Sequence, residues 1–282
     1  MIYTIQSEIL EVALCDLGAE LYSVKRAGVE RLWQNESGEW NGKAPILFPV
    51  CGHCGFTFQG KHYPLAAHGF ARKQIFTVED KGEDFIVFSL KDSDATRALY
   101  PFSFLFKVTY KVEKDTLSVT YEVQNTGEDT LYFACGSHES FLLNRPLGEH
   151  KLVFEKEEKL VHLYHDEEGY LTGKTEDLGC GKETFVPEKI VSGGETLILG
   201  DLNSRKVALV DADGKTVTEI TFEGFSNLLL WRPNKAWMIC IEPWTNLPDY
   251  SPEDRTEFPQ KAGVIAVRQG ESKKLVRTIA YK

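Results

Sequence analysis

The sequence lacks the features expected of a membrane-spanning, secreted or nucleic-acid-binding protein. Its longest apolar runs, such as Asn227 to Trp231 and Ala236 to Ile241, are far shorter than the roughly 20 residues of a transmembrane helix. The opening residues, MIYTIQSEIL, have neither the basic region nor the apolar core of a signal peptide, so we expect a cytoplasmic protein. Positive charge is scarce, because 32 Lys and Arg against 42 Asp and Glu give a formal net charge of −10. This balance disfavours nucleic acid and anionic membranes as partners.

The cysteines also lack the spacing of a metal site or a disulfide framework. Six are spread along the chain, at positions 15, 51, 54, 135, 180 and 240, and we expect free thiols in a reducing compartment. The stretch CGHC, Cys51 to Cys54, has the form of a dithiol redox motif, but there is no second C-x-x-C for zinc. A redox motif gains reactivity at a helix N-terminus, whereas the flanks LFPV and GFTFQGKHYPL indicate a strand and a hairpin. We therefore predict two small thiols in a strand–loop segment, with redox activity as the alternative.

Long amphipathic helices are absent as well, and alternation of apolar and polar residues dominates instead. Residues 106–112 and 117–123 alternate strictly around a turn at Lys114-Asp115, which predicts an antiparallel hairpin with one buried face. Turn signals such as Asp213-Gly214 separate further short strands. We predict these strands at Ile9–Leu14, Glu20–Lys25, Phe85–Leu90, Leu131–Gly136, Thr196–Leu199, Lys206–Val210, Val217–Phe222, Trp237–Glu242, Gly263–Val267 and Lys274–Ala280.

The pattern predicts one all-β domain over residues 1–282, built as a sandwich or barrel. Hydrophobic residues make up 42% of the chain, enough for a sizeable core, and no repeat or linker interrupts the pattern. Short helices are expected only at Ser93–Leu99 and around Pro252–Thr256. We interpret the acidic segment His165 to Asp177 as a solvated loop.

Three short stretches carry ionisable side chains among apolar residues. The first is AAHGFARKQIF, Ala66 to Phe76, in which His68 and Arg72 are separated by small and apolar residues. Taken alone, this pair is most simply a hydrogen-bonded core histidine and an ion-pairing arginine. A role in binding a ligand needs support from the other two stretches.

The second stretch is FACGSHESF, Phe133 to Phe141. Strand alternation places His138 on one face with Gly136, Ala134 and Tyr132. Small residues beside a histidine leave room for a ligand, and imidazole titrates near neutral pH, so His138 can act as a general acid. The alternative is a histidine at a strand end, hydrogen-bonded to a loop carbonyl.

The third stretch is AWMICIEPW, Ala236 to Trp244, in which Glu242 shares a face with Met238 and Cys240. Apolar surroundings raise the pKa of a carboxyl group unless it is paired, which suits a base working at neutral pH. An idle buried carboxylate would cost on the order of several kcal/mol. On an adjacent predicted strand, the indole of Trp231 can stack on a pyranose or simply pack in the core.

In this order, the motifs HGFAR, GSH-x-x-F and IEPW, with PILFPVCG and LLLW, resemble those of the aldose 1-epimerases, or galactose mutarotases. The resemblance is strongest to a bacterial, LacX-like subgroup and covers nearly the whole chain. It implies a large antiparallel β-sandwich, called a supersandwich, and interconversion of the α and β anomers of an aldose.

By the same resemblance, Glu242 is the general base and His138 the general acid. His68 binds the sugar, and Arg72 holds substrate hydroxyls, or a phosphate if there is one. No metal or organic cofactor is required. The partner is a small-molecule aldose, and a monomer and a homodimer are both left open.

Two departures from the family pattern fall on positions that hold substrate. The family usually has Gly-Arg where this chain has Gly52-His53, so an expected arginine is missing and His53 stands in its place. Family members commonly carry an aspartate before a strand like TLIL, where this chain has Glu195. Both departures bear on which sugar is bound rather than on the chemistry.

Other functions remain open at this point. A hexose-6-phosphate 1-epimerase carries a similar HGFAR motif but needs cationic groups for the phosphate, and the arginine expected at position 53 is missing. A sugar-binding module without turnover is the alternative outside enzymes, although the presence of both His138 and Glu242 favours catalysis. A glycoside hydrolase needs a carboxylate pair, and only Glu242 stands in a convincing setting.

Overall fold

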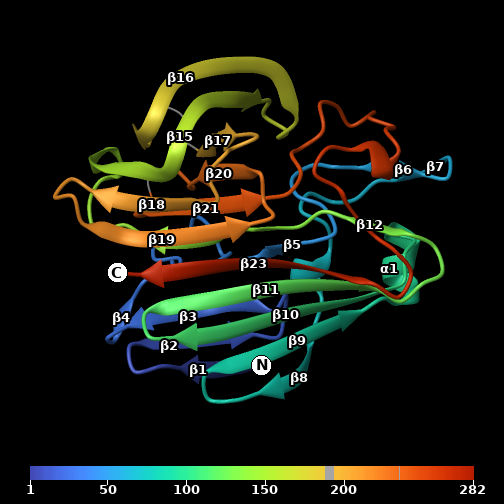
Figure 1. The fold of residues 1–282 in the computed structure, drawn as a ribbon, viewed down its shortest axis with the longest axis horizontal. Helices are drawn as coiled ribbons and strands as arrows, with labels where there is room; N and C mark the ends of the chain where they lie inside the picture. Colours follow the sequence, from blue (N-terminus) through green and yellow to red (C-terminus); the bar gives the residue numbers. More distant parts are fainter. Residues whose placement is uncertain (188–193, 235) are drawn as a thin grey trace.

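Alternating residues form strands along most of the chain, and the named strands pair antiparallel. The computed structural model describes residues 1–187, 194–234 and 236–282 (Figure 1). Its strands are β1 Ile2–Gln6, β2 Leu10–Cys15, β3 Glu20–Arg26, β4 Val29–Glu30, β5 Ile46–Leu47, β6 Phe56–Phe58, β7 Lys61–Tyr63, β8 Thr77–Lys81, β9 Phe85–Lys91, β10 Phe104–Glu113, β11 Thr116–Asn125, β12 Leu131–Phe133, β13 Gly136–Ser137, β14 Glu139–Leu142, β15 His150–His165, β16 Leu171–Phe185, β17 Thr196–Leu199, β18 Lys206–Asp211, β19 Thr216–Glu223, β20 Asn227–Trp231, β21 Met238–Trp244, β22 Ile265–Val267 and β23 Ser272–Tyr281.

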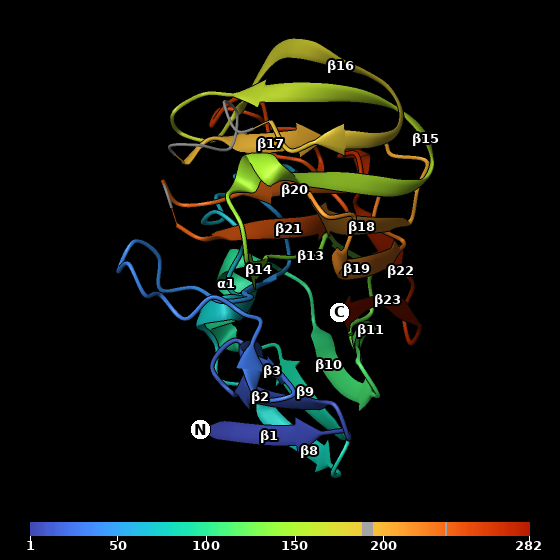
Figure 2. The same cartoon turned by 90° about the vertical axis from the view of Figure 1, so that its left-hand side faces the viewer.

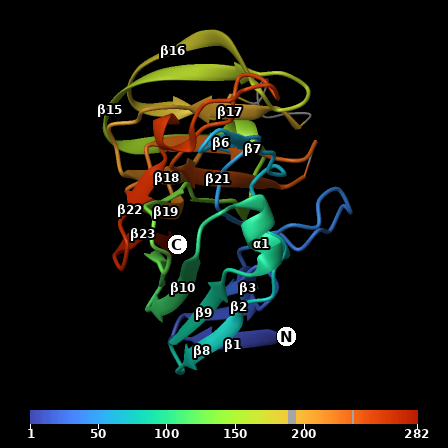
Figure 3. The same cartoon turned by 90° about the vertical axis from the view of Figure 1, so that its right-hand side faces the viewer.

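Most strands of the described residues join one 15-stranded sheet. Its order is β5-β13-β21-β20-β17-β15-β18-β19-β23-β11-β10-β9-β8, with β14 paired to β21 and β16 to β15. Strands β1 to β4 form a separate four-stranded sheet, which lies beside the β8–β10 end of the large one (Figures 2 and 3). Val12, Phe106 and Ile241, which come from β2, β10 and β21, belong to one continuous hydrophobic core. The fold is therefore the large, mostly antiparallel β architecture that the sequence predicts.

The strongest local prediction is confirmed. β10 and β11 form the expected hairpin, in which Phe106 lies opposite Val123 and Tyr110 opposite Val119. Apolar residues on both strands face the core because side chains alternate between the faces of a strand.

Helical structure is scarce, as expected. The predicted helix at Ser93–Leu99 is α1 (Asp94–Leu99), whose N-cap hydroxyl of Ser93 accepts a hydrogen bond from the Thr96 amide at 3.2 Å. Short 3₁₀ helices occur at Ala71–Lys73, Leu147–Glu149 and Phe258–Gln260. Among the described residues, no helix combines the length and apolarity needed to cross a bilayer.

Three local predictions are wrong. The segment His165 to Asp177 is not a loop, because β15 and β16 form a long hairpin that turns at residues 166–170. The predicted strand Leu131–Gly136 is interrupted, since β12 pairs with β22 and the chain then crosses to β13 beside β21. The segment Pro252–Thr256 forms a turn rather than a helix, and the Asp254 carboxylate accepts the Thr256 amide at 2.7 Å. This side-chain bond offers the backbone an alternative to helix.

Candidate active site

The register of neighbouring strands brings the two predicted catalytic residues together. Glu139 of β14 lies opposite Ile241 of β21, and one step along this register places His138 opposite Glu242. The next residue of β21, Pro243, has no amide hydrogen to donate, so the ladder is interrupted beside His138. His138 therefore stands in the gap between β13 and β14, facing Glu242.

Both side chains line one cavity of about 360 Å³, a size typical of small-molecule sites. His138 Nε2 lies 3.4 Å from Glu242 Oε1, and the two residues are 9% and 1% exposed. Within the described part of the chain, Glu242 Oε2 is buried without a hydrogen-bond partner. A buried acceptor left free in a cavity is available to a ligand hydroxyl.

The face of β21 follows the predicted alternation. Met238 and Cys240 pack in one cluster with Trp231. Ile239 and Ile241 point the other way, into the main core. Because side chains two apart share a face, Glu242 lies on the cavity side with Cys240.

Aromatic rings surround His138. Its imidazole is stacked on Trp40, with ring centroids 5.1 Å apart and an interplanar angle of 30°. Trp231 meets it edge to face at 5.6 Å, and His68 does so at 5.7 Å. The Trp231 indole N–H donates to the Gly194 carbonyl at 2.8 Å, which fixes the ring at the cavity wall. Trp40 is not predicted from the sequence, where its only signal is a tryptophan inside the polar stretch NESGEWNGK.

His68 is held in the cavity wall by an unusual backbone. Its φ is +66°, and it exchanges two bonds with Gly52: the His68 amide donates to the Gly52 carbonyl at 2.9 Å, and the Gly52 amide donates to His68 Nδ1 at 3.1 Å. Since Nδ1 is an acceptor, the ring proton is assigned to Nε2. Gly69, also at positive φ, cannot be replaced, because a Cβ there would lie 2.3 Å from the Phe48 carbonyl oxygen.

Arg72 also lines the cavity, but part of its bonding capacity is already used. Its Nη2 donates to the Ala67 carbonyl at 2.9 Å. Burial lowers the pKa of Arg72, and the carboxylate of Glu20 opposes that shift. Arg72 therefore brings a partly compensated positive charge to the site.

The turn of the β15–β16 hairpin closes one side of the cavity above His53. The His53 ring lies 5.1 Å from the ring of Tyr170, and a Cβ on Gly169 would lie 3.2 Å from His53 Cδ2. His165, Glu167 and Glu168 of this hairpin are part of the lining. These hairpin residues were missed because the segment was interpreted as a solvated loop.

Glu195 is the one predicted site residue outside the cavity lining. Its side chain is 60% exposed, and its Oε2 lies 3.8 Å from His165 Nε2. Because His165 is part of the lining, the carboxylate lies beside the cavity wall. The other six candidates, His53, His68, Arg72, His138, Trp231 and Glu242, all line it.

Burial sets the protonation of the central pair. Burial raises the pKa of Glu242 well above the ordinary range. The Trp244 indole lowers this pKa, and the negative charge of Glu139 raises it, both to a smaller extent than burial. Burial lowers the pKa of His138 to about 3. Both shifts favour the neutral form, as expected for ionisable groups in an apolar setting.

The CGHC thiols are unsuited to redox chemistry. Cys51 and Cys54 are buried and free, and no helix follows them. Burial raises the pKa of Cys51 strongly and that of Cys54 to about 12, whereas a reactive thiol needs a lowered pKa. This supports the interpretation as small core residues.

A metal ion is another ligand that the site could take. His138, Cys240 and Glu242 each offer a ligand atom, and these atoms lie within 4.8 Å of one another. The acid–base chemistry considered below uses His138 and Glu242 as free groups and needs no metal.

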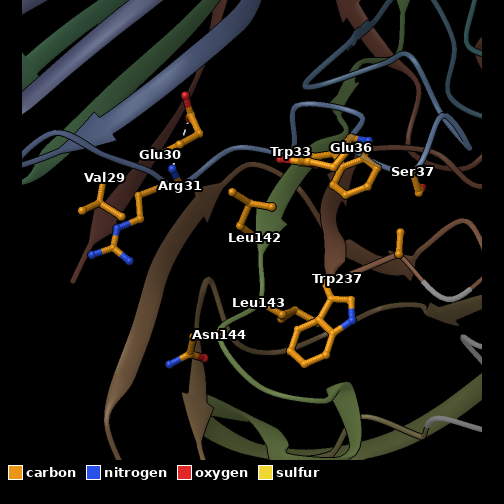
Figure 4. Close-up of a pocket in the computed structure, with 11 residues that line it drawn as sticks. Val29, Glu30, Arg31, Trp33, Glu36, Ser37, Leu142, Leu143, Asn144 and Trp237 are labelled. Carbon is orange, nitrogen blue, oxygen red and sulfur yellow. Dashed lines mark hydrogen bonds between the residues drawn. The ribbon is translucent and has the colours of Figure 1, made fainter.

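A larger hollow of about 580 Å³ lies elsewhere on the surface (Figure 4). Leu142, Leu143 and the half-exposed Trp237 form one side of it, with Val29 and Trp33 nearby. Its described lining includes no histidine that faces a carboxylate. The smaller cavity, which His138 and Glu242 line, is therefore the candidate active site.

Comparisons with known proteins agree with the geometry. The family profile described as "Aldose 1-epimerase" matches residues 1–278. "Protein LacX, plasmid" of Lactococcus lactis subsp. lactis is 31% identical over 267 residues, which cover 88% of each chain. The chain belongs to the aldose 1-epimerase family. The resemblance inferred from HGFAR, GSH-x-x-F and IEPW is thus confirmed.

Solved structures of similar proteins share the fold of this aldose 1-epimerase family member. A galactose mutarotase-like protein from Lactobacillus casei ATCC 334 is 26% identical, with a TM-score of 0.91 over 100% of both chains. A galactose mutarotase related enzyme from Lactobacillus acidophilus is 27% identical, with a TM-score of 0.89 over 100% of this chain and 97% of that one. The supersandwich expected from the sequence is therefore the observed fold.

Proposed function

We propose that the protein is an aldose 1-epimerase that interconverts the α and β anomers of an aldose by general acid–base catalysis. The observation that carries the proposal is the 3.4 Å approach of His138 Nε2 to Glu242 Oε1 inside a cavity of about 360 Å³. Trp40 and Trp231 line the same cavity, and indole faces suit the apolar face of a pyranose.

In ring opening, Glu242 removes the proton from the anomeric hydroxyl O1, and His138 gives a proton to the ring oxygen O5. The C1–O5 bond breaks and O1 becomes a carbonyl oxygen. After rotation about C1–C2, O5 attacks the other face of the carbonyl, and both protons return. Because O1 and O5 are bonded to the same carbon, an acid and a base only 3.4 Å apart can serve both. Each proton transfer contributes roughly 10²- to 10⁴-fold in rate.

This cycle needs one proton on the pair, and its location changes at each step. In the empty site, burial raises the pKa of Glu242 and lowers the pKa of His138 to about 3, so Glu242 holds a proton more tightly than His138 does. The same arrangement follows ring opening and precedes closure. A sugar hydroxyl that donates to the free Glu242 Oε2 lowers the pKa of this carboxyl group and prepares it to act as the base.

The remaining residues of the lining hold the substrate in this proposal. His68 and His53 offer ring nitrogens, Arg72 offers guanidinium donors, and Trp231 supplies a stacking surface. Glu195 acts at the rim through His165. Positioning matters because the reacting oxygens must meet both groups at once.

The test is polarimetry or NMR of freshly dissolved α-anomers over a panel of aldoses. The protein should accelerate mutarotation of at least one aldose well beyond the buffer rate. Glucose and its 6-phosphate, compared at equal concentration, separate the two substrate classes left open by the sequence. Sugar binding without any acceleration would identify a carbohydrate-binding protein and overturn the proposal.

A further inference from the structure

A buried ion pair lies directly behind the acid–base pair. Glu139 and Arg277 are 2% and 1% exposed, and Arg277 Nη2 donates to Glu139 Oε1. Arg277 also reaches the Tyr121 hydroxyl, with Nε at 3.2 Å and Nη2 at 3.0 Å. The guanidinium therefore holds a carboxylate and a phenol at the same time.

This ion pair joins strands that are not neighbours in the sheet. Glu139 begins β14, which pairs with β21, whereas Arg277 lies in β23, between β11 and β19. Glu139 is also the chain neighbour of His138, so the two side chains leave the strand on opposite faces. The contact consequently links the backbone that carries His138 to strand β23.

Such a contact is not needed for stability alone. A buried ion pair costs so much desolvation that hydrophobic residues of similar size are often as stable or more so. The ladder is interrupted beside His138, since Pro243 cannot donate a backbone hydrogen bond. This part of the strand thus needs another anchor if the imidazole is to keep its place.

We propose that Glu139 and Arg277 are positioning residues, which fix the backbone at His138 and thereby hold its imidazole against Glu242. The inference rests on the proposed function, because it assigns a role in the same acid–base site. Positioning errors of about 1 Å can cost roughly 10²-fold in rate.

The ion pair also acts on the site electrostatically. Glu139 contributes to the raised pKa of Glu242, and Arg277 opposes the burial that raises the pKa of Glu139 itself. Among the described residues, the other titratable groups that interact with these carboxyls or with Arg277 are His138, Cys51, Cys240, Tyr110, Tyr121, Cys135 and Tyr281. Removing the Glu139 charge should therefore move the titration of Glu242 in a known direction.

The main variant is Glu139→Gln, which keeps the shape but removes the charge. We expect kcat for mutarotation to fall by on the order of 10- to 10²-fold, with a smaller change in KM. The alkaline limb of the pH profile should move to lower pH, because a negative charge is gone and Arg277 is left unpaired. Arg277→Lys keeps the positive charge but loses the planar guanidinium, which can donate two parallel hydrogen bonds. This variant should therefore have a lower kcat, whereas the alkaline limb of its pH profile should stay near that of the wild type.

A matched control is Glu158→Gln. Glu158 is also a buried glutamate that binds backbone amides, those of Asn203 and Ser204, and within the described residues none of the three lines the cavity. It should lower thermal stability without changing kcat or the pH profile. If Glu139→Gln does not fold, Glu139→Gln/Arg277→Met removes both charges and should fold while keeping the low kcat.

The positioning role is overturned if Glu139→Gln retains the wild-type kcat and alkaline limb. If the wild-type protein itself shows no mutarotation, the proposed function fails, and the His138 ring resonances in NMR then decide the positioning role. Glu139→Gln should shift these resonances, whereas Glu158→Gln should not. Unchanged His138 resonances in Glu139→Gln would refute the positioning role of Glu139 and Arg277, whether or not the protein catalyses mutarotation.

Discussion

At the scale of single residues, His138 and Glu242 owe their properties to burial. Burial is the largest influence on the pKa of each, and it favours the neutral form of both side chains. Trp40 is central to this effect, because its indole covers one face of the imidazole at 5.1 Å. A site built this way holds a proton on Glu242 in preference to His138.

This arrangement predicts the pH dependence of kcat/KM. Below the pKa of His138, about 3, both groups are protonated and the base is lost. Above the raised pKa of Glu242, both are deprotonated and the acid is lost. We therefore expect His138 to cause no inflection near pH 6.5, the ordinary pKa of histidine.

The Trp40→Ala variant sharpens this test. It should admit water to the imidazole, raise the pKa of His138 toward about 6.5 and move the acid limb upward. NMR titration of the His138 ring and rate profiles from pH 4 to 9 measure both effects. An inflection near pH 6.5 in the NMR titration of His138 in the wild-type protein would show that this ring titrates like an exposed imidazole.

The sequence predicts much of the site at this scale, for physical reasons. The face of Glu242 follows from strand alternation, which the unbroken β21 obeys. Trp40 lies in a segment between β4 and β5 without periodicity, so no pattern indicates where its ring points. Contacts made by irregular segments depend on tertiary packing that local sequence does not encode.

At the scale of elements, the β15–β16 hairpin shapes the open side of the site. Its turn sets Gly169 and Tyr170 against His53, which occupies the position where the family usually has arginine. β16 is largely exposed, and among the described strands it pairs with β15 alone, so its sequence shows little apolar alternation. That is why a charged strand was taken for a loop.

A pair of glycine substitutions tests the role of this hairpin. Gly169 and Gly173 both have positive φ, +89° and +79°, so alanine at either position meets a comparable backbone strain of roughly 1–2 kcal/mol. Only at Gly169 would the new Cβ lie close to a side chain, 3.2 Å from His53 Cδ2, whereas nothing lies within 4 Å at Gly173. We expect Gly169→Ala to raise KM several-fold and Gly173→Ala to leave it unchanged. If initial-rate kinetics gave equal KM values for Gly169→Ala and Gly173→Ala, the hairpin would have no role in substrate binding.

At the scale of the whole molecule, the site is built at a cost to stability. Glu242 is buried, and burial holds its folded-state pKa above the unfolded value of about 4.5. The folded protein therefore keeps a proton that the unfolded chain loses as pH rises above 4.5. The contribution of Glu242 to the free energy of unfolding is fully present below that pH and is lost as pH rises toward the folded-state pKa.

Glutamine at position 242 does not titrate, so the Glu242→Gln variant should not lose stability in this way as the pH rises. Its free energy of unfolding should match that of the wild type near pH 4.5 and exceed it increasingly above, by at most about 1.4 kcal/mol per pH unit. Thermal unfolding at pH 5 and pH 8 measures the difference, and the gain should be larger at pH 8. A variant that is less stable at both values would mean that the carboxylate is stabilised by contacts in the folded state.

The fold class was predictable because strand alternation recurs from Phe104 to Val123 and again in the C-terminal strands. The strand order was not, since β13, β14 and β21 meet through pairings 96 to 108 residues apart, from Leu142 with Met238 to Gly136 with Trp244. His138 and Glu242 meet only because of that long-range register. The family resemblance, rather than local pattern, is what paired them in advance.

The most direct measurement of the central claim is the mutarotation rate of His138→Gln, Glu242→Gln and the double variant, with sugar binding measured in parallel. Two groups that share one proton act as a unit, so each single variant should lose roughly 10²- to 10⁴-fold in kcat. The double variant should then be little slower than the worse single one. Wild-type rates in Glu242→Gln, or losses that simply multiply in the double variant, would contradict the account.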